Sequence, residues 1–178
     1  YTLGGRTPRW ASAQPDAFSP YGPGQCAEPS TMTRWTDWVR EIATRYRGRI
    51  TLWEIWNEPD VPGFYCGTAD QLVELAHQAY LVLKEVDPSN RVLSPGFASS
   101  IGHLDYFLAR GGGNWSDIIS FHFYVSTPEE AVGWRLANLR ASLDRRGQSA
   151  NSVSYTAQAW LTNLPPWPPG PGADAAHV

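Results

Sequence analysis

The sequence predicts an α/β fold in which helices alternate with the strands of a parallel sheet. Four segments are rich in β-branched and aromatic residues and have the length of buried strands: 50–56, 91–94, 117–125 and 152–156. Between them, apolar residues recur at helical spacing. A strand, a helix and another strand at these spacings need a crossover connection, so the strands are expected to run parallel. Doubly wound sheets and closed barrels both satisfy this pattern.

The first two helices are marked by end signals as well as by periodicity. An apolar stripe at helical spacing runs from Trp35 to Tyr46, and Gly48 supplies the stop. The second helix is expected to begin at a capping box, in which Thr68 and Gln71 satisfy backbone donors of the first turn.

Two later helices connect the remaining strands. The segment from Leu104 to Leu108 has helical spacing, and three glycines at 111–113 end it. Thr127 is the expected N-cap of the last helix, because Pro occupies the first helical position and Glu130 follows three residues after the cap.

The composition indicates one folded domain at residues 1–160 and a flexible tail at 161–178. Of the 178 residues, 42% are hydrophobic and 17% are charged, which is enough to bury one core. Five prolines lie between Leu164 and Gly172, where no periodicity survives. The chain opens at Tyr1 without a Met or a leader, and we interpret it as a piece of a longer protein.

Charge and hydropathy argue against two classes of partner. The net charge of −3 provides no basic surface for nucleic acid, and no run of about 18 apolar residues predicts a membrane span. Nine Trp exceed what a core of this size usually needs, and sugar faces stack on aromatic rings. The composition is therefore compatible with a carbohydrate site.

The two cysteines, Cys26 and Cys66, lie in separate predicted loops and allow a single intramolecular disulfide. A disulfide would predict a secreted or extracytoplasmic protein. Two free thiols are the equally weighted alternative, because the sequence does not supply the Cα separation that a bridge requires.

Glu58 is the strongest candidate catalytic residue. It follows directly after the strand at 50–56, and in parallel α/β folds the reactive groups lie where strands end. Asn57 beside it is suited to donate a hydrogen bond to a sugar hydroxyl. The simpler alternative for Glu58 is an exposed carboxylate at the start of a loop. Glu54 should lie deeper in the strand, as a buried and hydrogen-bonded structural carboxylate.

His122 and Tyr124 are the candidate partners of this carboxylate. They stand two residues apart in the strand at 117–125 and therefore share one face near its end. Trp10 and Tyr21 are candidate stacking surfaces for a sugar, although packing explains each of them equally well.

No cofactor or metal is expected. The four histidines show no ligand spacing with carboxylates or Cys: His77, His103, His122 and His177. The glycines at 111–113 follow a helix instead of opening one after a strand, so they do not form a phosphate loop.

The segment Trp-Glu-Ile-Trp-Asn-Glu-Pro at 53–59 resembles the fourth-strand motif of the retaining glycosidase superfamily that includes the cellulase-like family 5 and the family 39 glycoside hydrolases. The resemblance implies a partial (β/α)8 TIM barrel, roughly strands 3 to 7. It also implies that Glu58 is the acid/base and that Asn57 contacts the sugar 2-hydroxyl. The segment Phe-His-Phe-Tyr at 121–124 resembles the sixth strand of these enzymes.

The chain departs from this family at the seventh strand. Related sequences carry a nucleophilic Glu in a pattern like Thr-Glu-x-Gly-Trp, whereas this chain reads Thr-Ala-Gln-Ala-Trp at 156–160. Ala157, or Gln158 after a shift of one residue, stands at the nucleophile position, and neither forms a glycosyl ester. A truncated or misread coding sequence, a genuine pseudoenzyme and an engineered change all account for this.

The leading hypothesis is a retaining glycosidase lineage that hydrolyses a β-linked poly- or oligosaccharide, represented here by an impaired or inactive chain. A non-catalytic carbohydrate-binding pseudoenzyme is the alternative. A partial barrel that binds nothing and associates through its open sheet edges is the third hypothesis.

Overall fold

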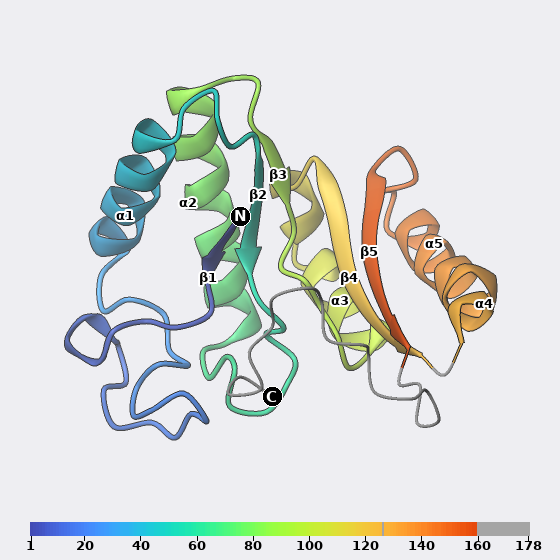
Figure 1. Ribbon diagram of the computed structural model, residues 1–178, viewed down its shortest axis with the longest axis horizontal. Coiled ribbons are helices and arrows are strands. Elements are labelled where there is room, and N and C mark those ends of the chain that lie inside the picture. Colours follow the sequence, from blue (N-terminus) through green and yellow to red (C-terminus); the bar gives the residue numbers. More distant parts are fainter. Residues whose placement is uncertain (126, 160–178) are drawn as a thin grey trace, which may run out of the picture.

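The structure, a computed structural model, describes residues 1–125 and 127–159, and these residues form a five-stranded sheet (Figure 1). The strands are β1 (Thr2–Gly4), β2 (Leu52–Trp56), β3 (Arg91–Leu93), β4 (Ile118–Val125) and β5 (Ser152–Ala159). All neighbouring strands pair in parallel, as the crossover argument predicts.

The order of the strands in the sheet is the order in the chain, β1-β2-β3-β4-β5. A doubly wound sheet reverses its strand order at a switch point, whereas each strand of a (β/α)8 barrel adds to the same edge. The sequential order therefore confirms the partial barrel and excludes the doubly wound alternative.

The helices occupy the crossovers between the strands. They are α1 (Met32–Arg45), α2 (Ala69–Val86), α3 (Ile101–Ala109), α4 (Pro128–Glu130) and α5 (Leu136–Arg145). A π-helical segment at Ala131–Arg135 joins α4 to α5, and short 3-10 helices at Arg9–Ala11 and Gly112–Trp115 had no counterpart among the predicted elements. In Figure 1, α1 and α2 lie beside β1 and β2, and α4 and α5 lie beyond β5.

The predicted end signals are present in the structure. Thr68 and Gln71 form the complete capping box of α2, which confirms the prediction. The hydroxyl of Thr127 accepts a hydrogen bond from the amide of Glu130 at 3.3 Å, as expected of the N-cap of α4. Gly48 follows α1 in the left-handed region, with a φ of 71°.

The hydrophobic core lies between the sheet and the helices. Phe121, Phe123 and Val125 of β4 are buried in it, and the intervening Ser120, His122 and Tyr124 belong to the opposite face by strand alternation. One face of β4 thus builds the core, and the other is free to build a polar site. No helix within the described ranges is long and apolar enough to cross a bilayer.

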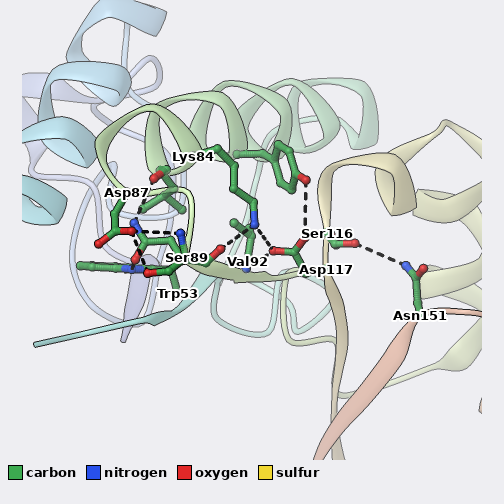
Figure 2. Close-up of polar contacts among 11 residues, drawn as sticks. Trp53, Lys84, Asp87, Ser89, Val92, Ser116, Asp117 and Asn151 are labelled. Carbon is green, nitrogen blue, oxygen red and sulfur yellow. Dashed lines mark hydrogen bonds and ion pairs between the residues drawn. The ribbon is translucent and has the colours of Figure 1, made fainter. Parts of the chain in front are cut away.

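A polar network joins α2 and the segments that lead into β3 and β4, next to the amino ends of β2, β3 and β4 (Figure 2). The Lys84 ammonium donates to the Asp117 carboxylate at 2.7 Å and to the carbonyl of Asn90 at 2.5 Å. Asp117 also accepts from the amide of Val92 at 2.8 Å, and the Trp53 indole donates to the side chain of Asn90 at 2.9 Å. These bonds satisfy polar groups at the end of the sheet away from Glu58. The predicted tail at 161–178 lies outside the described residues.

Candidate active site

Glu58 lies just beyond the carboxyl end of β2 in an unusual backbone conformation. Its φ is 47°, in the left-handed region that residues other than Gly rarely adopt. Its amide donates to the carbonyl of Gly96 at 2.9 Å, and its carbonyl accepts from the amide of Val61 at 3.0 Å. The side chain is held at the strand end with the residue only 8% exposed, which contradicts the alternative of an exposed loop carboxylate.

Two donors from β4 converge on one oxygen of this carboxylate. Nδ1 of His122 lies 2.9 Å from Oε1 of Glu58, and the hydroxyl of Tyr124 donates to the same oxygen at 2.6 Å. The two side chains share a face of β4 because they stand two residues apart. The structure thus brings together three residues that the sequence singled out.

A second carboxylate, that of Glu54, lies on the other side of His122. Its Oε2 is 3.6 Å from Nε2 of His122 and accepts from the hydroxyl of Ser120 at 2.8 Å. Its Oε1 accepts from the hydroxyl of Thr2 at 3.0 Å. Glu54 is therefore a hydrogen-bonded carboxylate inside the sheet, as expected, and it also contacts the candidate site.

These contacts affect the protonation of His122 and Tyr124. The carboxylates of Glu54 and, to a smaller extent, Glu58 raise the pKa of His122 to about 9, against the effect of burial. At neutral pH the imidazole is thus an imidazolium, in which Nδ1 donates to Glu58 at 2.9 Å and Nε2 lies 3.6 Å from the Glu54 carboxylate. The hydrogen bond to Glu58, together with burial, raises the pKa of Tyr124 to about 12, so its hydroxyl stays protonated and donates.

Gly96 makes room for this cluster. A Cβ at this position would lie 2.6 Å from Nε2 of His122 and 2.8 Å from Oε2 of Glu54, closer than real Cβ contacts. Any side chain here would push the histidine and the carboxylate apart. Gly96 carries no signal of this role in the sequence, because its neighbours come from distant parts of the chain.

Asn57 lines an open polar cleft beside the catalytic candidate. The cleft has a volume of about 360 Å³ and is lined by residues of β1, the segment after it and the end of β2: Thr2, Leu3, Gly4, Gly5, Arg6, Tyr21 and Asn57. The guanidinium of Arg6 lies over the Tyr21 ring at 3.9 Å from its centroid. Donors, acceptors and an aromatic ring meet here, a combination that small-molecule sites use.

Trp10 is not brought to Glu58 by its described contacts. It is 76% exposed and lines a separate, mainly apolar cleft of about 270 Å³ with Trp35, Trp38 and Trp56 among others. The guanidinium of Arg34 lies 5.2 Å from the centroid of its ring. A stacking role for Trp10 stays a prediction.

Asp60 is a residue of this region that the sequence analysis missed. Its side chain is 1% exposed and accepts from the amides of Ala98, Ser99 and Ser100 at 2.8 to 3.1 Å. It ties the loop after β2 to the loop after β3 and so fixes the rim of the site. The Asp-after-Pro position in a loop gave no signal of these partners.

Cys26 and Cys66 are free thiols that lie close together. The amide of Cys66 donates to the carbonyl of Cys26 at 3.0 Å, which joins the loops after β1 and β2. Burial, followed by the hydrogen bond to Cys26, raises the pKa of the Cys66 thiol to about 12. The disulfide is not formed in the structure and stays a prediction.

The strand that corresponds to the seventh barrel strand carries no carboxylate. β5 pairs with β4 so that Ala157 stands opposite Phe123 and Gln158 opposite Tyr124. No Asp or Glu occurs between Ser152 and Ala159.

Within the described part of the chain, no group of three or more His, Cys, Asp or Glu side chains is arranged to hold a metal ion.

Solved structures share this fold. The chain is similar to a family 39 β-xylosidase from Caulobacter crescentus, with a TM-score of 0.67, 21% identity, and coverage of 93% of this chain and 37% of that one. It is similar to a family 39 enzyme from Xanthomonas axonopodis pv. citri, with a TM-score of 0.63, 18% identity, and coverage of 87% and 34%. It is also similar to a glucosidase from Croceicoccus marinus, with a TM-score of 0.59, 22% identity, and coverage of 70% of this chain and 30% of that one.

These similarities establish the fold class, a partial (β/α)8 barrel. The chain spans about a third of the length of the solved structures it resembles. No family model and no curated protein matches the sequence. At this level of identity the likeness is one of fold, and the function rests on the site itself.

Proposed function

We propose that this chain belongs to a retaining glycoside hydrolase lineage that acts on a β-linked poly- or oligosaccharide, with Glu58 as the general acid/base. The observation that supports this most is the position of Glu58. It is a buried carboxylate at the carboxyl end of a barrel strand, and two donors from β4 hold its Oε1. Among the described residues Oε2 has no such partner, which leaves one oxygen for a ligand.

Retaining hydrolysis needs this carboxyl group twice. It first protonates the leaving glycosidic oxygen and later takes a proton from the attacking water, while a second carboxylate about 5 to 5.5 Å away forms the glycosyl ester. His122 and Tyr124 orient the acid/base, and Asn57 is placed in the adjacent cleft to bind a sugar hydroxyl. No carboxylate of β5 is available as the nucleophile, so we expect this polypeptide to hydrolyse glycosides poorly or not at all.

Gln158 is the position of β5 in register with Tyr124, which lies on the Glu58 face of β4, whereas Ala157 is in register with Phe123 of the core face. Three chains therefore test the proposal: the natural one, Gln158→Glu, and Gln158→Glu combined with Glu58→Gln. The natural chain should not release nitrophenol from p-nitrophenyl β-D-xyloside or β-D-glucoside, and the Gln158→Glu chain should gain turnover that Glu58→Gln then removes. Rapid turnover by the natural chain that Glu58→Gln abolishes would overturn the expected inactivity. Turnover in the Gln158→Glu chain that survives Glu58→Gln would overturn the role of Glu58.

A non-catalytic carbohydrate-binding protein is the second candidate, favoured by a polar cleft that persists beside a strand without a nucleophile. Equal affinity of the natural chain and of Glu58→Gln for a β-linked disaccharide, with no turnover in any variant, would select it. We also propose export, which would follow from a disulfide between Cys26 and Cys66, two thiols that are free in the structure. Thiol counting with and without reductant tests that bond directly.

A further inference from the structure

We propose that Glu54 is a positioning residue of the Glu58 site, which holds His122 in the orientation that presents Nδ1 to Glu58. The inference rests on the proposed function, because it assigns a role within the same site. Its physical basis is a relay of three side chains, in which the carboxylates of Glu54 and Glu58 lie at opposite nitrogens of one imidazole.

The relay is held at its far end by hydroxyl groups from two strands. Thr2 of β1 donates to Oε1 of Glu54, and Ser120 of β4 donates to Oε2. A carboxylate with both oxygens bonded keeps one orientation, so it can fix a neighbouring ring. Glu54 is also only 12% exposed, which strengthens its interaction with the imidazole.

The contact between Glu54 and His122 is not needed to satisfy the Glu54 carboxylate, because both of its oxygens already accept hydrogen bonds. Both side chains extend toward each other over Gly96, where a Cβ would contact each of them. A purely structural carboxylate would be satisfied by Thr2 and Ser120 alone. Nε2 of His122 lies 3.6 Å from Oε2 of Glu54, which is within ion-pair distance but beyond hydrogen-bond distance.

The groups that face His122 from the packed elements determine its charge. β2 contributes Glu54, the segment directly after β2 contributes Glu58, β4 contributes Tyr124, and the segment after β1 contributes Tyr21 next to Tyr124. Among these described groups both carboxylates favour the imidazolium and no cation opposes it. Two N–H donors fix the ring between the carboxylates, and removal of one carboxylate should free it to rotate or to lose a proton.

Nuclear magnetic resonance of the imidazole nitrogens tests this directly. In the natural chain both nitrogens of His122 should show the protonated signature at neutral pH. In Glu54→Gln the pKa of His122 should fall by about one unit or more, as expected when an opposite charge within about 6 Å is removed. An unchanged pKa and an unchanged nitrogen signature in a folded Glu54→Gln chain would overturn the proposal.

The combined variant Thr2→Val with Ser120→Ala is the second test, because it keeps the charge of Glu54 and removes its anchors. It should leave the pKa of His122 raised but broaden the ring signals, and signals as sharp as in the natural chain would overturn the positioning role. Binding of p-nitrophenyl β-D-xyloside and β-D-glucoside is measured in parallel. A His122 that responds to Glu54 in a chain that binds neither glycoside would support this inference and count against the proposed function.

Discussion

The stability of the chain should decrease between mildly acidic and mildly alkaline pH because of His122. Its pKa is about 9 in the folded chain, against an ordinary value of 6.5. A group whose pKa is raised by folding stabilises the folded state in full below its unfolded pKa, and this contribution is lost as the pH rises through the folded pKa. The window for the loss therefore runs from about pH 6.5 to about pH 9.

The size of the effect follows from the same two values. A difference of about 2.5 units corresponds to at most roughly 3.4 kcal/mol of unfolding free energy, at about 1.36 kcal/mol per unit. Between about pH 5.5 and about pH 8.5 the linkage relation gives a loss of roughly 2.5 kcal/mol. The imidazole is only 16% exposed, so solvent screening reduces this value little.

Other perturbed groups titrate outside this window. Arg146 lowers the pKa of Asp105 to about 2, so the stability that this pair contributes is complete well below pH 5.5. The raised pKa values of Cys66 and Tyr124, both about 12, affect stability only at more alkaline pH. The decrease in the window should therefore report mainly on His122.

Urea unfolding followed by tryptophan fluorescence measures the effect at several pH values. Glu54→Gln is the matched variant, because it removes the charge that contributes most to the raised pKa of His122 and keeps the side-chain shape. Its unfolding free energy should fall less steeply with pH than that of the natural chain. A flat or rising profile in the natural chain, or equal slopes in the two chains, would refute the reasoning.

Two further predictions concern packing and charge away from the site. Lys84→Met should lower the unfolding free energy by about 2 kcal/mol, because it leaves the partly buried Asp117 carboxylate without its cation. Arg40→Met is the matched control in the same urea assay, because it breaks an exposed ion pair with Glu85. It should lower the unfolding free energy much less than Lys84→Met, and equal losses in the two variants would contradict this prediction. Gly4→Ala should cost about 2 kcal/mol or more, because its Cβ would lie 2.1 Å from the buried Trp56 ring; urea unfolding of this variant at natural stability would contradict it.

Much of the fold was predictable because its signals are local. The capping box at Thr68, the cap at Thr127 and the period-two pattern of β4 each involve residues within a few positions of one another. The choice between a barrel and a doubly wound sheet was not predictable from periodicity. It depends on which edge each strand joins, and helical or strand spacing does not encode that order.

The candidate site was predictable only to the extent that its residues mark strand ends. Glu58 and Tyr124 stand at the ends of predicted strands, and alternation alone places Tyr124 and His122 on one face. The partners of Glu54 were not predictable, because Thr2 is 52 residues away and Ser120 is 66 residues away in the sequence. A shift of one residue in strand register would place either hydroxyl on the opposite face.

The barrel itself explains why residues of β2 and β4 meet although β3 lies between them. Two strand spacings amount to about 9.6 Å, too far for direct contact in a flat sheet whose side chains stand parallel. In a barrel, inward side chains from alternate strands converge and share one layer. Gly96, which follows β3, leaves that layer open, so Glu54 and His122 form an ion pair across it at 3.6 Å. The curvature of the sheet and one missing side chain therefore create the relay to Glu58, and both are needed for it.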